Sequence, residues 1–505
     1  MGNFRVILLA LLSITIAGGG CFVDFTAPAS DDNDAGLGPD AAPGCGDGVL
    51  DSNEVCDGTD LGGETCEGLG YESGVLGCDG FCVLNESGCQ AFAVCGDGVV
   101  DATEVCDDGN SRDWDGCTQC GISEFLVNSE TAGNQGEPAL IPVGEGFVAV
   151  WSGDGAGAGE RRVWGQRFDS FATADGAPFL VSAAAAVNGE VNRAPAAARL
   201  ADGSFVVAWI REGAGEQRVV GRLFDSLSVP IGTIFDVGDL APNADDSPAV
   251  ASTPNGGFVV AWIAFEAGFL RAYTRRFDFD AVPLGASVRA DGAGGFDPAD
   301  PRVAAATDGR FLVVWTDQDT AGRLYVRARH FLAAGAVGGV VFDVPADVAG
   351  WHSTPDVAAT PDGGYVVVWE GLLDPVNGSW DIFARRFDAE VAPLEVDRLV
   401  NTQGASDQLR PAVSAGPDGL LVAWETQVGA DWDLAARVLD FQGGMSTVEL
   451  STHVYQNGWQ TSAAVTTTVP GNYIVAWQSD LQDGSLWGVY AQRFTTDGTA
   501  LGVGP

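Results

Sequence analysis

Seven short apolar runs, each ending in tryptophan, recur along this chain at a nearly fixed spacing. The first is Phe147–Trp151 (FVAVW), and the others end at Trp209, Trp262, Trp315, Trp369, Trp424 and Trp477. Successive tryptophans are 58, 53, 53, 54, 55 and 53 residues apart. A period of this length indicates that one supersecondary unit is repeated and that neighbouring units bury a shared core.

The repeat that contains Trp369 shows how one unit is built. Its apolar run is continuous rather than alternating, which predicts a strand buried on both faces. Pro355–Ala358 precedes this run as a first strand, Asp381–Asp388 follows as a third, and a fourth ends near Asn401. Four strands with both faces covered, repeated radially, are typical of a propeller blade. We therefore expect an all-β chain with a seven-bladed β-propeller over residues 122–505.

Two other residue types keep a fixed place in the repeats. A proline stands where the first strand is expected: Pro195, Pro248, Pro301, Pro355 and Pro411. An arginine lies two residues before the end of the expected third strand: Arg222, Arg275, Arg329, Arg385 and Arg437. Because the arginine recurs in five units, pairing with carboxylates or stacking on aromatic rings within each unit explains it better than one anionic ligand does.

The last repeat lacks its fourth strand. Only Val503–Pro505 follow its third turn, whereas Phe125–Asn128, before the first repeat, has the composition of a fourth strand. We expect Phe125–Asn128 to pair with the segment 489–494, because an unpaired edge would invite aggregation.

Ten of the 11 cysteines lie between residues 45 and 120. The segments Cys45–Asp57 and Cys95–Asp107 are closely similar, which indicates two cysteine-rich modules, residues 45–90 and 91–121. Modules this small cannot bury a sufficient core, so an even number of cysteines predicts disulfide bonds. The expected disulfide cysteines are Cys45, Cys56, Cys66, Cys78, Cys82, Cys89, Cys95, Cys106, Cys117 and Cys120. The sequence leaves their pairing open.

The eleventh cysteine, Cys21, ends a segment with the features of an export signal. Arg5 precedes an apolar run, Val6–Ala17, that is too short to span a bilayer. The small residues Gly19 and Gly20 before Cys21 resemble a bacterial lipobox. This resemblance implies a lipoprotein signal peptide over residues 1–21, with Cys21 as the lipid anchor. Residues 22–44 have the composition of a disordered acidic tether.

Two parts of the sequence resemble known surface proteins. The CGDG…E-x-CDDGN…DGC-x-x-C pattern of residues 45–120 resembles the myxobacterial cysteine-rich repeat. The GGFVVAW…ARRFD units resemble β-propeller-like repeats of large bacterial surface proteins. These resemblances imply a lipid-anchored lipoprotein of the outer membrane or cell surface. A secreted protein without a lipid is the alternative.

Charge restricts the partners. The chain has 69 acidic and 25 basic residues, a net charge of −44, so we expect no nucleic-acid binding. Membrane contact is expected through the lipid anchor only. An oxygen-rich stretch of the second module is a candidate calcium site, with the ligands Asp107, Asp108, Asn110, Asp113 and Asp115. Turn-forming Asp and Asn residues explain the same stretch without a metal, and no other cofactor is indicated.

Catalytic motifs are missing from the sequence, and no catalytic residue is assigned. Aromatic residues at expected loops of the later repeats give the best candidates for ligand binding: Trp351, Trp459, Trp380, Trp432 and Trp487. Aromatic side chains on loops stack on sugars or anchor protein partners, although packing against the sheet edge explains them equally. We therefore expect non-catalytic binding or scaffolding with a glycan or protein ligand. The alternative is an extracellular propeller hydrolase that acts on polysaccharide, and a purely structural envelope protein is a third interpretation.

Overall fold

The computed structural model describes most of the chain from residue 48 onward. The described residues are 48–50, 54–66, 68–69, 71, 73–90, 115–118, 121–154, 160–182, 189–213, 215–238, 248–292, 297–347, 349–374, 378–402, 406–446, 448–469 and 471–502. They belong to two compact units, residues 1–92 and residues 93–505. The expected signal peptide with Cys21 and the expected tether lie outside the described residues, so both stay predictions. Within the described ranges, no helix is long and apolar enough to cross a membrane.

The smaller unit consists of short strands joined by disulfide bonds. Its elements are β1 (Ser73–Gly74), β2 (Gly77–Cys78), β3 (Leu84–Asn85), the 3₁₀ helix η1 (Glu86–Gly88) and β4 (Cys89–Gln90). β1 pairs with β4, and β2 pairs with β3. Cys56 bonds to Cys78 and Cys66 bonds to Cys89, so the structure supplies two pairings that the sequence left open.

Two further cysteines in the described residues, Cys82 and Cys117, are also disulfide-bonded. The other expected disulfide cysteines lie outside the described residues: Cys45, Cys95, Cys106 and Cys120.

The larger unit repeats one antiparallel arrangement of four strands, here designated a to d in chain order. Strands a are β7 (Gln135–Val143), β11 (Val191–Arg199), β15 (Ala249–Ser252), β19 (Asp297–Ala305), β23 (Trp351–Ala359), β27 (Gln408–Ala415) and β31 (Gln460–Thr467). Strands b are β8 (Gly146–Asp154), β12 (Phe205–Gly213), β16 (Phe258–Glu266), β20 (Phe311–Gln318), β24 (Tyr365–Leu372), β28 (Gly419–Val428) and β32 (Tyr473–Asp480).

The outer strands of each repeat follow in the same order. Strands c are β9 (Arg161–Phe168), β13 (Glu216–Phe224), β17 (Phe269–Phe277), β21 (Leu324–Phe331), β25 (Asp381–Phe387), β29 (Asp431–Asp440) and β33 (Trp487–Phe494). Strands d are β10 (Phe179–Leu180), β14 (Pro230–Asp236), β18 (Val288–Arg289), β22 (Phe342–Asp343), β26 (Arg398–Leu399) and β30 (Leu450–Ser451). In every sheet a pairs with b, b with c, and c with d, and one parallel contact between β11 and β9 joins the first two repeats.

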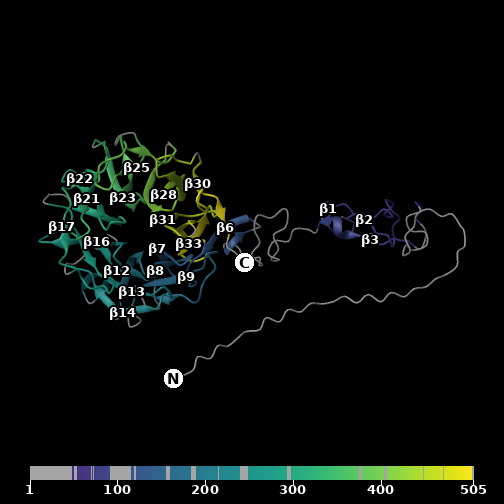
Figure 1. Cartoon of the computed structure of the whole chain (residues 1–505), viewed down its shortest axis with the longest axis horizontal. Coiled ribbons are helices and arrows are strands. Elements are labelled where there is room, and N and C mark those ends of the chain that lie inside the picture. The colour runs from purple at the N-terminus through teal and green to yellow at the C-terminus, as the bar shows by residue number, and fades with distance from the viewer. Residues whose placement is uncertain are drawn as a thin grey trace, which may run out of the picture. The chain divides into compact units, whose positions relative to one another are not determined.

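The sheets of the larger unit are arranged radially around a common centre (Figure 1). All seven strands a line one central cavity of about 460 Å³. Strands b are buried almost throughout, which confirms the prediction made from their continuous apolar runs. Their side chains form apolar clusters, each shared by two successive repeats. A further cluster, which contains Trp151 and Ile474, joins the last repeat to the first.

A β-bulge explains why proline recurs in the first strand. In six strands a, the register of the ladder shifts at a residue with positive φ: Glu137, Ala194, Asp300, Thr354, Arg410 and Ser462. A proline follows five of these six residues. Proline has no N–H, and a bulge leaves a position where the ladder needs no donor. The sequence-based start of a strand at Pro355 was therefore wrong, because β23 begins at Trp351, before the bulge.

A strand from the N-terminal side completes the last sheet. β6 (Gly121–Leu126) pairs with β33, with Phe125 opposite Ala491 and Leu126 opposite Tyr490. The backbone N–H of Val127 donates to the carbonyl of Val489 at 2.8 Å. The predicted pairing of Phe125–Asn128 with the third strand of the last repeat is confirmed.

The N-terminal strand has the same register as an internal strand d. Phe125 lies opposite Ala491 just as Phe179 lies opposite Gly165 in the first repeat. The fully buried carboxylate of Glu124 accepts the backbone N–H groups of Val454 and Tyr455, at 2.8 and 2.9 Å, and the amide of Gln482 at 2.9 Å. β5 (Asp115–Thr118) pairs with the outer side of β6, and β34 (Ala500–Leu501) pairs with the end of β33.

Candidate functional site

One face of the larger unit collects the variable connections. Neighbouring strands of an antiparallel sheet alternate in direction, so the b–c and d–a connections leave the sheets at the same edge. This edge, named the variable face here, carries the five tryptophans that the sequence indicated as ligand candidates. Trp432 and Trp487 lie in strands c, opposite Gln427 and Asp480 of strands b, so their expected place in loops was wrong.

The remaining three candidates are held by the backbone at the same edge. Trp351 is the first residue of β23 and is 36% exposed, so its expected place in a loop was wrong. Trp459 precedes β31, is 45% exposed, and accepts the N–H of Asp480 through its carbonyl at 2.9 Å. The N–H of Trp380 donates to the carboxylate of Asp407 at 3.0 Å. None of the five lines the central cavity or either of two further cavities of the larger unit, of about 530 and 410 Å³. The structure therefore does not gather them into one site.

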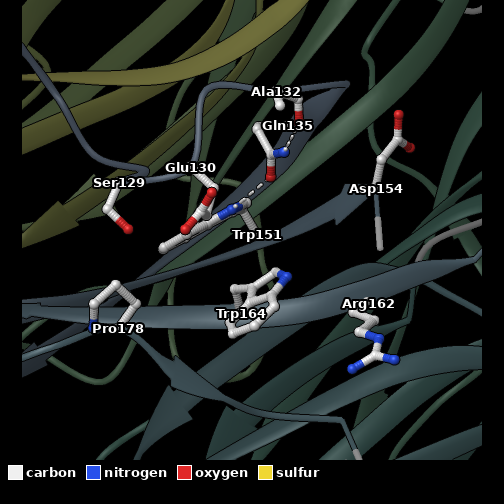
Figure 2. A pocket seen from close by; sticks show the side chains of 9 residues that line it. All are labelled: Ser129, Glu130, Ala132, Gln135, Trp151, Asp154, Arg162, Trp164 and Pro178. Carbon is white, nitrogen blue, oxygen red and sulfur yellow. Dashed lines mark hydrogen bonds between the residues drawn. The ribbon is translucent and has the colours of Figure 1, made fainter. Parts of the chain in front are cut away.

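A cavity of about 530 Å³ lies on the variable face at the first repeat (Figure 2). It is lined by Ser129, Glu130, Ala132, Gln135, Trp151, Asp154, Arg162, Trp164 and Pro178. The first three come from the segment between β6 and β7, and the others from strands a, b and c of the first repeat and from the approach to β10. In the view of Figure 2, the Trp164 indole lies in the middle, with Pro178 towards one side and Arg162 towards the other. We name this the Trp164 cavity.

Hydrogen bonds fix the walls of the Trp164 cavity. The buried indole of Trp151 donates to the side-chain oxygen of Gln135 at 3.2 Å, and the amide of Gln135 donates to the carbonyl of Ala132 at 3.2 Å. The carboxylate of Asp154 accepts the backbone N–H of Asn134 at 2.8 Å. These bonds tie the segment before β7 to strands a and b, so the cavity does not depend on an unsupported loop.

The charged groups of the cavity differ in whether an ion pair neutralises them. Arg162 donates to the carboxylate of Glu160 at 3.1 Å, and both side chains are mostly buried. Glu130 is exposed to solvent at the cavity rim. The guanidinium is therefore compensated inside the wall, whereas the carboxylates of Glu130 and Asp154 add negative charge to the cavity.

Sequence reasoning missed this site. Trp164 lies opposite Trp151 in the β8–β9 pair and is half-buried. Four of the six equivalent residues in the other repeats are buried: Val220, Tyr273, Phe383 and Tyr490. One signal could have found it, because the first repeat alone has a tryptophan at this position of strand c.

A further cavity, of about 410 Å³, is lined by residues of repeats three to six. Its carboxylate Glu370 already serves the framework. One carboxylate oxygen of Glu370 accepts the hydroxyl of Ser353 at 2.7 Å, and the other accepts the N–H of Arg410 at 2.8 Å. The neighbouring Glu425 accepts the N–H of Ser462 at 2.8 Å and the guanidinium of Arg410 at 2.8 Å. Burial raises the pKa of Glu425, an effect that Arg410 opposes.

These contacts belong to a hydrogen bond that recurs between repeats. In repeats four to seven, the residue after the strand-b tryptophan accepts the N–H of the bulge residue in the next strand a. Thr316 does this for Thr354 at 2.9 Å, and Gln478 does it for Glu137 at 3.2 Å, across the junction of the last and first repeats. The polar ring around the centre is therefore largely structural.

The recurring arginines are also structural. Each donates to the carbonyl of the residue that directly follows strand d of the preceding repeat: Arg222 to Val181, Arg275 to Val237, Arg329 to Ala290, Arg385 to Val344 and Arg437 to Val400. Three of them also lie over the phenylalanine that ends their own strand, at 5.6 to 5.8 Å from the ring centroid. The expected contacts within a repeat are present, because these three arginines stack on their own phenylalanine, and Arg385 and Arg437 pair with Asp397 and Glu449 at 3.7 and 3.9 Å. The hydrogen bond to the preceding repeat is an additional contact that the sequence did not indicate.

A buried histidine in the fifth repeat takes the place of the glutamine that bonds to the strand-b tryptophan in the sixth repeat. His352 accepts the indole N–H of Trp369 through Nδ1 at 3.2 Å and contacts the carbonyl of Asp347 through Nε2 at 2.7 Å. Gln408 makes the same two kinds of bond to an indole and to a carbonyl in the sixth repeat. Burial lowers the pKa of His352 below its ordinary value of 6.5.

The candidate calcium site is not described by the structure. Asp107, Asp108, Asn110 and Asp113 lie outside the described residues, and Asp115 is the first residue of β5. Among the residues that the structure does describe, no group of three or more His, Cys, Asp or Glu side chains is placed to hold a metal ion. Calcium binding stays a prediction.

Comparisons with known proteins give one sequence match and several resemblances of fold. A domain of unknown function, DUF4215, matches residues 76–121, within the predicted cysteine-rich region. No curated protein matches.

Three similar solved structures illustrate the resemblance of fold. A protein of unknown function from Dyadobacter fermentans has 12% identity and a TM-score of 0.45, covering 73% of this chain and 98% of its own. The β-propeller domain of the Trilobed protease from Pyrococcus furiosus has 9% identity and a TM-score of 0.45, covering 75% and 97%. An α-L-arabinanase from Penicillium chrysogenum has 13% identity and a TM-score of 0.41, covering 59% and 92%. At these values, none of the three carries an argument about the function of this chain.

Proposed function

We propose that residues 122–505 form a seven-bladed β-propeller that is closed by exchange of a strand between its ends. Two observations support this. Each apolar cluster joins successive repeats, and the cluster of Trp151 and Ile474 joins the last to the first. The central cavity is lined by strand a of every repeat. β6 then supplies strand d of the last blade, which leaves no open end in the ring.

For the location of the protein, we propose export and attachment to the outer membrane or cell surface through a lipid on Cys21. Secretion without a lipid is the alternative. Disulfide bonds in both units support a compartment outside the reducing cytoplasm. Labelled fatty acid should be incorporated by the wild type and not by Cys21→Ser. Labelling that survives this substitution would contradict the proposal.

The proposed activity is non-catalytic binding of an extracellular ligand, a glycan or a protein, on the variable face. The Trp164 cavity carries this proposal. It combines an accessible indole with a few polar groups in a concave site, as small-ligand sites do. The acidic groups near the centre point away from catalysis, because both oxygens of Glu370 and both oxygens of Glu425 accept framework hydrogen bonds.

One observation favours the alternative, an extracellular hydrolase that acts on polysaccharide. Glycoside hydrolysis needs a carboxyl group whose raised pKa keeps it protonated as a general acid. Burial raises the pKa of Glu425, which is 1% exposed and is linked through Arg410 to the neighbourhood of Glu370.

Binding and turnover can be measured together. The full chain would be incubated with insoluble polysaccharides, with the bound fraction and the release of reducing ends followed in the same samples. Binding without release is the expected result. Release that disappears in Glu425→Gln, and persists in the exposed control Glu390→Gln, would establish the hydrolase instead.

A further inference from the structure

We propose that the Trp164 cavity binds an uncharged sugar unit of a glycan, stacked on the Trp164 indole, an assignment that rests on the proposed binding function. The matched domain does not point to this site, because residues 76–121 lie outside it. The expected ligand residues of the later repeats contribute nothing to its lining.

The first step of the argument is the platform. Trp164 lies on β9 beside its cross-strand neighbour Trp151, which is anchored by Gln135. Trp164 packs at the edge of the apolar cluster that joins the last repeat to the first, so its ring is supported on one side and open to the cavity on the other. A rigid indole with one open face binds the apolar face of a flat or ring-shaped ligand at low entropic cost.

The second step is the arrangement of polar groups. A sugar ring carries hydroxyl groups around its edge, and each hydroxyl both donates and accepts hydrogen bonds. The cavity offers acceptors in the carboxylates of Glu130 and Asp154 and a donor in the guanidinium of Arg162. In the view of Figure 2, Glu130 lies above and to the left of the Trp164 ring and Arg162 lies to its right, so polar groups border the ring on two sides of this view.

The third step is charge, which selects among sugars. Arg162 is compensated by Glu160, so Glu130 and Asp154 leave the cavity with a net negative charge. The whole chain adds a net charge of −44. A uronic acid or a phosphorylated sugar would meet repulsion in such a site. An uncharged sugar meets no such repulsion, and its hydroxyl groups can donate to the carboxylates of Glu130 and Asp154.

Calorimetry on the full chain tests this with three sets of probes: neutral cello-, malto- and xylohexaose, acidic hexagalacturonate, and cationic hexaglucosamine. At least one neutral hexasaccharide should bind at one site per chain, and hexagalacturonate should bind at least tenfold more weakly than that ligand. Trp164→Ala should weaken binding of the neutral hexasaccharide about tenfold or more, because it removes the platform. Trp164→Phe keeps a ring in place and should recover most of the affinity.

A matched control separates the cavity from the rest of the variable face. Trp380→Ala removes a half-buried tryptophan from the equivalent edge of the fifth repeat and should change the affinity less than twofold. Equal losses in Trp164→Ala and Trp380→Ala would overturn the assignment. A loss of binding in Trp351→Ala or Trp459→Ala, with Trp164→Ala unaffected, would overturn it while leaving the proposed binding function intact.

Two further results would decide against the proposal in different ways. Binding of hexaglucosamine or hexagalacturonate tenfold more tightly than any neutral probe would refute the choice of an uncharged sugar. Cleavage of a bound neutral probe would refute the non-catalytic function itself, whatever the effect of Trp164→Ala. Glu130→Arg should reduce the discrimination against hexagalacturonate at least fivefold, and unchanged discrimination would contradict the charge argument.

Discussion

The exchanged strand β6 should carry as much stability as an internal strand of the ring, and Phe125→Ala tests this. Phe125 is 4% exposed and packs against Phe147 and Phe168 of the first repeat, with ring centroids 6.5 and 5.6 Å away. Phe235, in strand d of the second repeat, packs in the same way on Phe258 and Phe277 of the third, at 6.0 and 5.6 Å. Phe235→Ala is therefore the matched control.

The expected loss follows from the burial of the ring. Replacing a buried phenylalanine with alanine costs about 3–5 kcal/mol through lost transfer energy and the cavity that remains. For a unit of about 380 residues, an unfolding entropy of about 2.1 cal/mol/K per residue converts this to a drop in Tm of about 4–6 °C. Phe125→Ala should lose at least as much as Phe235→Ala, because Phe125 is the more deeply buried of the two.

Thermal and urea unfolding of the full chain, followed by tryptophan fluorescence, would measure both variants. A loss of less than about 1 kcal/mol for Phe125→Ala, alongside the full loss for Phe235→Ala, would show that β6 does not hold the ring closed. A second comparison uses chains that begin at residue 121 or at residue 134. The shorter chain lacks β6 and leaves the edge of β33 unpaired, so it should melt earlier and aggregate more readily.

Three more substitutions test other parts of the structure. The pKa of His352 is lowered in the folded state, so the unfolded state binds more protons below pH 6.5. The free energy of unfolding therefore decreases as the pH is lowered below 6.5, by up to about 1.4 kcal/mol per pH unit. His352→Gln keeps the indole bond and should reduce this slope between pH 7 and 5 in urea unfolding, and an unchanged slope would contradict the assignment. Removal of the disulfide that closes 23 residues, by Cys66→Ser with Cys89→Ser, should destabilise the smaller unit by about 3 kcal/mol and leave the melting of the larger unit unchanged, as read by hydrogen exchange. Arg275→Ala should cost about 1–3 kcal/mol, because it removes a bond to the preceding repeat and a contact with Phe277, and a loss below about 0.5 kcal/mol would count against that role.

Much of the fold was predictable because its signals are local and repeated. Continuous apolar runs such as Phe258–Trp262 can only be strands buried on both faces, and the structure confirms this. The pairing of β6 with β33 was predictable from a strand missing at one end and a spare one at the other. The bulge in strand a was missed, since proline marks the position but does not state that the strand starts earlier.

The candidate site was less predictable because it depends on contacts between distant segments. The Trp164 cavity combines strands of the first repeat with Ser129–Ala132, which precedes β7, and no local pattern shows that these segments meet. Tryptophans such as Trp351 can be recognised in the sequence as single residues. A binding site also needs a concave wall, which the sequence does not show. The hydrogen bonds of the recurrent arginines to the preceding repeat were not foreseen for a similar reason, because a repeat pattern does not show which neighbour accepts a hydrogen bond.

The strand exchange also sets the order in which the chain can complete its fold. Leu126 pairs with Tyr490, 364 residues later, whereas Leu180 pairs with Trp164 only 16 residues away. Loop closure over the longer distance costs roughly 3 kcal/mol more. During synthesis, β6 emerges before strands a to d of the larger unit, so its edge stays without its partner β33 until residues near 490 are made. An open strand edge makes an incompletely folded chain prone to wrong pairing, so this interval is the stage of folding most exposed to aggregation.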